Sequence, residues 1–177
     1  PMFLFLLISS ALANEPVGAT LPVNPSVPPG IEVPLPDDPL AEALKRYNEW
    51  DNEGALAILE PYLASPQSYK QRTSTRLLLG RVYLELGDYN LASAQFYRVR
   101  KGEGGDAKVA AWYEAKVDLL RGKPHTAIKE CNEYMERFPD GRRASECMVI
   151  IGDAQAALGR IGEAKKTYQE YLDKPAH

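Results

Sequence analysis

An alanine that recurs at a nearly constant interval is the feature that most restricts how this chain can fold. The alanine stands at Ala55, Ala92, Ala127 and Ala164, with intervals of 37, 35 and 37 residues. A larger side chain stands four residues after each alanine, and a small one twelve residues before it. The larger residues are Leu59, Phe96, Cys131 and Tyr168, and the small ones are Ala43, Gly80, Ala115 and Gly152. Self-similarity at such a period indicates a repeated structural unit.

The residue types at these positions are those that two closely crossing helices need. A small residue on each helix lets the two helices approach, and the larger residue one turn further on fills the space beside the crossing. Gly87, Gly122 and Gly159 share one phase, where a left-handed cap at the end of a first helix favours glycine. We therefore expect four helix-turn-helix units and no strand across residues 38–177.

Longer segments at the same phase extend the similarity between units. The second unit contains "LLLGRVYLELGDYNLASAQF", the third "AAWYEAKVDLLRGKPHTAIKECNEYMERFP" and the fourth "CMVIIGDAQAALGRIGEAKKTYQEYL". The first, "LAEALKRYNEWDNEGALAILEPYL", is degenerate, as terminal repeats often are. The chain here resembles the tetratricopeptide repeat family, although its intervals are longer than that family's usual unit. The resemblance implies an all-α fold, a right-handed superhelical stack of about four repeats, known as an α-solenoid.

In that family the first helices of the units line a concave groove that binds a partner segment. The residues of this chain at the equivalent positions of the repeat are Leu44, Tyr47, Leu77, Arg81, Leu84, Trp112, Lys116, Leu119, Val149 and Asp153. Some family members clamp a terminal carboxylate with Lys and Asn, but the corresponding positions here hold Leu77 and Trp112. An extended or helical apolar peptide therefore fits better. The alternative role for Trp112 is packing in the core between repeats. Tyr113, the next residue, is the other candidate for that packing role.

The first residues of the sequence have the composition of an export signal. A short apolar run at 3–8 is followed by small residues that end in Ala11-Leu12-Ala13, an A-x-A cleavage pattern. The run is shorter than the roughly 20 residues that cross a membrane. We expect a signal peptide at 1–13, although no Lys or Arg precedes the run. The alternatives are a buried strand or an N-terminal helix of the fold.

Prolines dominate the next segment, residues 14–37, which we expect to be an extended linker or arm. Proline lacks an amide donor and fixes φ, which excludes both a helix and a central strand. No cysteine follows the signal directly, so a lipid-anchored start is not expected. The predicted location is accordingly exported, either periplasmic or associated with the outer membrane.

The helical part of the chain lacks the residue patterns that carry chemistry. The two histidines, His125 and His177, have no neighbouring acidic or cysteine residues at metal-ligand spacing. A glycine-rich phosphate loop and a nucleophile elbow are absent. The net charge of -3, with no basic block, argues against nucleic acid as a partner. We expect no catalytic, cofactor or metal site.

Two cysteines, Cys131 and Cys147, fall on helices expected to be neighbours. Export would permit a disulfide between them, and closing such a loop would stabilise the fold by about 3 kcal/mol. The alternative is a pair of free, buried cysteines that pack as small apolar residues.

These observations predict a non-enzymatic scaffold for protein–protein interaction in the bacterial cell envelope. Its partner would be another protein or peptide segment of an envelope complex. Self-association through a terminal repeat is a further prediction, since an uncovered helix can pair with its copy. The alternative function is the helical N-terminal part of a longer cell-wall enzyme, such as a lytic transglycosylase, whose catalytic domain lies elsewhere.

Overall fold

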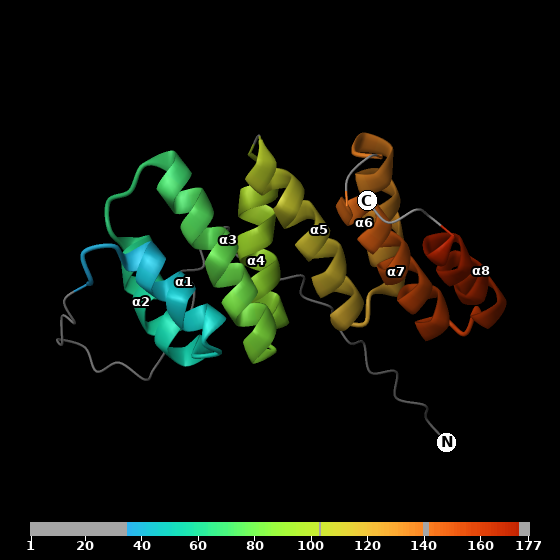
Figure 1. Cartoon of the computed structure of the whole chain (residues 1–177), viewed down its shortest axis with the longest axis horizontal. Helices are drawn as coiled ribbons and strands as arrows, with labels where there is room; N and C mark the ends of the chain where they lie inside the picture. Colours follow the sequence, from blue (N-terminus) through green and yellow to red (C-terminus); the bar gives the residue numbers. More distant parts are fainter. Residues whose placement is uncertain (1–34, 103, 140–141, 174–177) are drawn as a thin grey trace, which may run out of the picture. The chain divides into compact units, whose positions relative to one another are not determined.

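A computed structural model describes residues 35–102, 104–139 and 142–173 of the chain. These residues form eight helices and no strand (Figure 1). The helices are α1 (Pro39–Asn48), α2 (Asn52–Ala64), α3 (Tyr69–Leu86), α4 (Tyr89–Arg100), α5 (Gly105–Leu120), α6 (Pro124–Arg137), α7 (Arg142–Ala157) and α8 (Ile161–Leu172). The predicted signal peptide and almost all of the predicted linker lie outside the described residues. None of the described helices is long and apolar enough to cross a bilayer.

Local sequence signals explain where several helices begin and end. The carboxylate of Asp51 accepts a hydrogen bond from the Gly54 amide at 2.9 Å and caps the start of α2. Ser68 and Gln71 form a reciprocal capping box at the start of α3. Glycines with φ between 73° and 82° follow α3, α5 and α7, so the predicted left-handed glycine caps are present.

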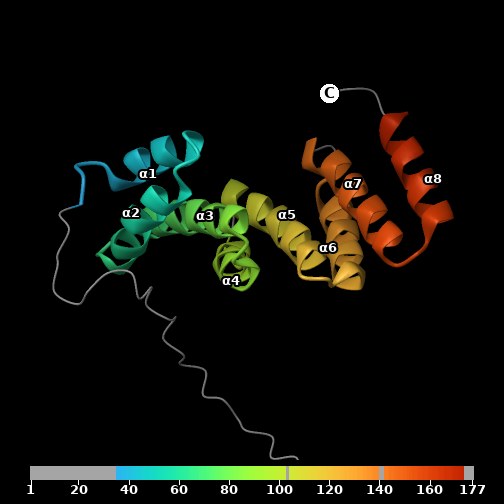
Figure 2. The ribbon, with the colours of Figure 1, turned by 90° about the horizontal axis from the view of Figure 1, so that it is seen from below.

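The helices pack in sequence order, as Figures 1 and 2 show. Each helix contacts the next, and in addition α1 contacts α3, α3 contacts α5, and α5 contacts α7. The second helices of the units, α2, α4, α6 and α8, do not contact one another. The first helices therefore form one continuous inner layer, and the predicted all-α solenoid of helix pairs is confirmed.

The recurring small and large residues meet as the spacing predicted. Gly80 of α3 faces the ring of Phe96 of α4, and a Cβ placed on Gly80 would lie 2.6 Å from Phe96 Cε1. In the fourth unit Gly152 of α7 packs in the same way against the ring of Tyr168 of α8. Each glycine thus makes room for an aromatic ring between the two helices of its unit.

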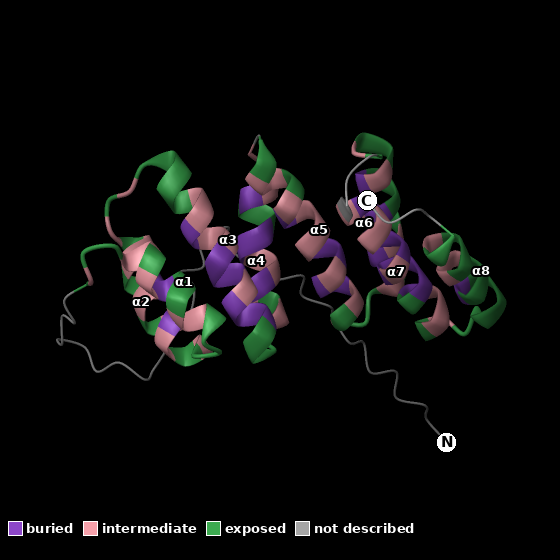
Figure 3. Ribbon diagram, viewed as in Figure 1, coloured by how far each residue is buried: buried purple, intermediate pink, exposed green. Residues whose placement is uncertain are grey.

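The buried residues form two apolar clusters that adjoin at α5. One extends from α1 to α5 and includes Leu59, Phe96 and Val117, whereas the other extends from α5 to α7 and includes Cys131 and Ile150. Figure 3 shows the buried residues concentrated on α3, α4, α5 and α7, while α8 is mostly exposed. The helix α5 therefore contributes to both clusters.

Candidate functional site

The inner layer of first helices carries every residue of the predicted groove. Its members divide into a part on α1 and α3, and a part on α5 and α7. The first part comprises Leu44, Tyr47, Leu77, Arg81 and Leu84, and the second Trp112, Lys116, Leu119, Val149 and Asp153. The second part lines a hollow.

The hollow between α5 and α7, called here the α5–α7 hollow, has a volume of about 300 Å³. Its lining consists of Trp112, Lys116, Leu119, Leu120, Glu146, Val149, Ile150 and Asp153. All five predicted groove residues of α5 and α7 are among these. The walls are mainly apolar, and the charged groups are one lysine and two carboxylates. Such a hollow suits one apolar side chain of a partner with a polar group beside it.

Trp112 is held in this hollow by aromatic and cationic neighbours. Its ring meets that of Tyr113 edge to face, with centroids 4.7 Å apart. The guanidinium of Arg143 lies over the indole at 4.4 Å, and the ammonium of Lys116 lies 5.9 Å from the same ring. The indole Nε1 is buried and has no hydrogen-bond partner among the described residues. Trp112 is half-buried, so it serves both packing and the wall of the hollow.

The charged groups around the hollow differ in how they are paired. Arg143 Nη1 lies 3.6 Å from Glu146 Oε2. Asp153 accepts a hydrogen bond of 2.6 Å from the Tyr168 hydroxyl, which raises the pKa of Tyr168 to about 12. Lys116 makes no ion pair with any described residue. It is therefore the cation of this hollow that a partner's carboxylate would meet.

In the part on α1 and α3, one residue is misassigned. Tyr47 and Leu77 pack against the core, Arg81 lies over the Tyr47 ring at 4.5 Å, and Leu44 is 41% exposed. Leu84 is only 7% exposed and belongs to the core. Its side chain is part of the first apolar cluster, so packing covers it although it follows Leu77 and Arg81 at helical spacing. Leu84 is therefore removed from the groove.

Three residues of the hollow were not predicted, namely Leu120, Glu146 and Ile150. Helical phase could have indicated Glu146, which precedes Val149 by three residues and therefore lies on the same face. Leu120 and Ile150 directly follow predicted positions and widen the wall. Their inclusion depends on how far α5 and α7 are separated, which the sequence does not give.

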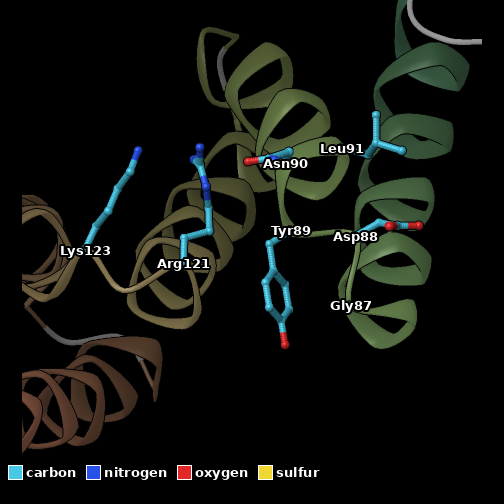
Figure 4. Close-up of a pocket in the computed structure, with 7 residues that line it drawn as sticks. All are labelled: Gly87, Asp88, Tyr89, Asn90, Leu91, Arg121 and Lys123. Carbon is cyan, nitrogen blue, oxygen red and sulfur yellow. The ribbon is translucent and has the colours of Figure 1, made fainter.

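A second hollow, the turn hollow, lies between the α3–α4 turn and the α5–α6 turn (Figure 4). Its volume is about 550 Å³, and residues 87–91, Arg121 and Lys123 line it. Arg121 Nη1 donates to Asp118 Oδ1 at 3.2 Å and to Ser93 Oγ at 3.3 Å. Figure 4 shows the Arg121 and Lys123 side chains extending in the same direction. Apart from its two basic residues, no sequence feature indicates this hollow.

A buried cluster of charged residues joins α4, α5 and α6. Arg100 lies 2.9 Å from Glu114 and 3.2 Å from Glu130, so one guanidinium serves two carboxylates. Burial raises the pKa of Glu114 to about 7 and also raises that of Glu130. Neither hollow includes these carboxylates. Their shifted pKa values therefore reflect packing between helices and do not by themselves mark an active site.

The two cysteines lie side by side in the second apolar cluster. Both are buried and free, and a hydrogen bond between the thiols together with burial raises the pKa of Cys131. Among the described residues, no group of three or more His, Cys, Asp or Glu side chains could hold a metal ion.

Comparisons with known proteins agree with this architecture. Residues 73–99 and 146–176 each match a sequence model of the tetratricopeptide repeat. These segments fall on the second and fourth units. No curated protein matches the chain in sequence.

Solved structures with the same fold include two crystal structures of nearly identical TPR-like repeats from Podosopora anserina, in a protein assigned as a kinesin light chain. Both are 14% identical to this chain and cover 76% of it, with TM-scores of 0.64 and 0.62. The alignments cover 71% and 72% of those chains. At this identity the likeness concerns the fold alone.

Proposed function

Because the chain contains tetratricopeptide repeats, we propose that it is a non-enzymatic scaffold that binds a segment of a partner protein along its inner layer. Repeats of this kind generally mediate protein–protein interaction. The observation that carries the proposal is the α5–α7 hollow, where an aromatic wall, aliphatic side chains and an unpaired Lys116 converge. Aromatic residues in such positions are typical anchors of binding interfaces.

The lining of the hollow also suggests the chemistry of the partner segment. An aliphatic or aromatic side chain would enter between Trp112 and Val149, and a neighbouring carboxylate would meet Lys116. Arg81, which makes no ion pair with a described residue, would attract acidic groups further along the layer. The proposed ligand is therefore an apolar peptide with one or more acidic residues.

Selection from a displayed peptide library tests this proposal. Peptides selected on the wild type should lose at least about tenfold in affinity for a Trp112→Ala/Lys116→Ala variant. Tyr97→Ala is the matched control, because Tyr97 is an exposed aromatic on α4 that lines neither hollow. Equal binding by the wild type and the double variant would count against the α5–α7 hollow as the site. Pull-downs from envelope extracts with a Trp112→Ala/Arg81→Ala variant extend the test to natural partners.

The proposed setting is the bacterial cell envelope, and residues 1–13 are its support. Export with cleavage after Ala13 would give a mature chain that begins at Asn14. Sequencing the N-terminus of the protein from its native cell checks this directly. A chain retained in the cytoplasm with residues 1–13 intact would refute it.

The alternative proposal, a helical part of a longer cell-wall enzyme, concerns the context of the same repeats. The natural open reading frame distinguishes the two, since a catalytic domain after His177 would favour the enzyme.

A further inference from the structure

The turns inside the four units lie along one edge of the helical unit, the lower edge in Figure 1, called here the turn edge. In three of the turns the residue in the left-handed conformation is a glycine: Gly87, Gly122 or Gly159. In the first turn this residue is Trp50, with φ 64°. A residue with a Cβ is strained there, and a bulky one is a clear outlier.

Trp50 is also 82% exposed, the largest exposed fraction among the large apolar residues that the structure describes. A strained backbone and an indole ring in water are both unfavourable in a single free chain. Strain of this kind is commonly found where a contact with another molecule compensates for it. Trp50 therefore indicates an interaction on the turn edge, away from the inner layer.

Every turn on this edge exposes one large apolar residue. Besides Trp50, these are Leu86 at 37%, Leu120 at 46% and Ile161 at 53% exposure. Each unit thus contributes one apolar group to the turn edge that a second molecule could cover.

The charges on the turn edge reverse in sign along the chain. The first turn carries Glu49, Asp51 and Glu53, and among the described residues only Asp51 of these three has an ion pair, with Arg46. The third turn carries Arg121 and Lys123, which share the single carboxylate Asp118. The second turn carries Asp88, which also lines the turn hollow, and the fourth carries Arg160 paired with Glu163. Two copies that run in opposite directions would bring the acidic first turn of each beside the basic third turn of the other.

The turn hollow provides a receptor for the exposed indole. It lies between the second and third turns, next to Arg121 and Lys123, and its volume of about 550 Å³ admits a tryptophan side chain. A cation beside the face of an indole is a favourable contact, which strengthens when water is excluded. The basic groups of the hollow would then lie near Glu49 and Glu53 of the entering turn.

We propose that the turn edge is an interface between two copies of this chain, related by a two-fold axis, in which Trp50 of each copy enters the turn hollow of the other. A two-fold interface uses the same patch twice, so both contacts form together. The inner layer and the α5–α7 hollow lie beside the turn edge and share only Leu120 with it among the residues named, and the inference does not rest on the proposed function.

Sedimentation of the full chain over a range of concentrations, combined with thermal unfolding, tests the pairing. Trp50→Gly should abolish the concentration-dependent dimer and raise the melting temperature of the monomer, since glycine suits the left-handed turn. A variant that no longer dimerises but melts at a higher temperature has lost the interface and kept its fold. A wild type that stays monomeric at every concentration, or a Trp50→Gly variant that still dimerises, would overturn the proposal.

Charge reversal tests the antiparallel arrangement. A Glu49→Lys/Glu53→Lys variant and a Lys123→Glu variant should each dimerise at least about tenfold more weakly than the wild type. Mixing the two should restore association, because each acidic turn then meets a basic one. Failure of the mixture to associate would refute the antiparallel pairing.

A matched control distinguishes this interface from pairing through the terminal helix. Leu172→Ser removes an apolar side chain that is 71% exposed on α8 and lies away from the turns. The turn-edge dimer should persist in this variant. Loss of the dimer in Leu172→Ser with retention in Trp50→Gly would assign the contact to the terminal repeat and overturn our inference.

Discussion

The ring of Phe96 lies against the backbone of Gly80, so close that a Cβ on the glycine would stand 2.6 Å from Cε1 of the ring. Phe96 is fully buried, and both residues belong to the pattern that recurs through the chain. The repeat of the sequence is thus a repeat of one crossing between two helices.

Enlarging Gly80 or Gly152 should therefore destabilise the fold. Gly80→Ala forces Phe96 to move, and overpacking of this kind costs about 1–3 kcal/mol, with Gly80→Leu costing more. Denaturant unfolding followed by circular dichroism measures the change. Gly162→Ala is the control, because no atom lies within 4 Å of the added Cβ and the site is helical. An unchanged unfolding midpoint for Gly80→Leu would contradict the packing described.

Ala92→Leu should have a comparable effect from the opposite helix. Ala92 of α4 is completely buried and belongs to the same apolar cluster as Phe96. A longer side chain there pushes α3 and α4 apart, at an expense of about 1–3 kcal/mol or more. Ala94→Leu, at a half-buried position on the same helix, should cost less. Equal melting temperatures for Ala92→Leu and the wild type would be inconsistent with this crossing.

The stability of the joint between α4, α5 and α6 should fall as the pH rises toward neutrality. Burial raises the pKa of Glu114 from 4.5 to about 7, so the folded state holds a proton that the unfolded chain has released. This contribution is complete below pH 4.5 and is lost progressively up to about 7. The pKa of Glu130 shifts in the same direction.

Urea unfolding at several pH values measures this loss, on the order of 1–3 kcal/mol across the window. Glu114→Gln should flatten the profile, because an amide does not titrate. A wild-type profile that rises over the same interval would show that Glu114 is ionised in the folded protein.

Exposure to an oxidising environment should link Cys131 and Cys147. Their thiols already lie within hydrogen-bonding distance across α6 and α7, both buried. The bond would close a short loop and add about 3 kcal/mol to the stability. Intact mass with and without reductant detects it, and Cys147→Ser provides the unlinked control. Two free thiols in protein isolated from an oxidising compartment would rule the linkage out.

Much of the fold was predictable from the sequence because the repeat signal lies in the packing residues themselves. Ala92 and Phe96 mark the second helix of a unit, and Gly87 marks the end of the first. The surface was harder to predict. Leu84 stands at a groove position by its spacing from Leu77 and Arg81, but it is only 7% exposed and belongs to the first apolar cluster. Repeat phase fixes which residues are equivalent, while the exposure of each depends on neighbouring side chains.

Trp50 illustrates the same limit. It aligns with Gly87 in the repeat, so its place at the end of α1 follows from the sequence. Its left-handed backbone conformation could not be predicted from the sequence, because glycine is the residue normally found in that conformation. The turn continues into α2 with Asp51 as its cap, and this closure holds Trp50 in a conformation that the residue itself disfavours.

Contacts between the eight described helices extend no further than the next unit, and this restricts how a disturbance can spread. Each helix contacts its neighbours in sequence, each first helix also contacts the first helix of the adjoining unit, and the two apolar clusters adjoin at α5. Such a chain unfolds locally in segments. Its backbone amides exchange fastest in the terminal helices and slowest in helices that are covered by neighbouring helices on both sides. The helix α8, with one buried residue, should therefore exchange its amides long before α3 does.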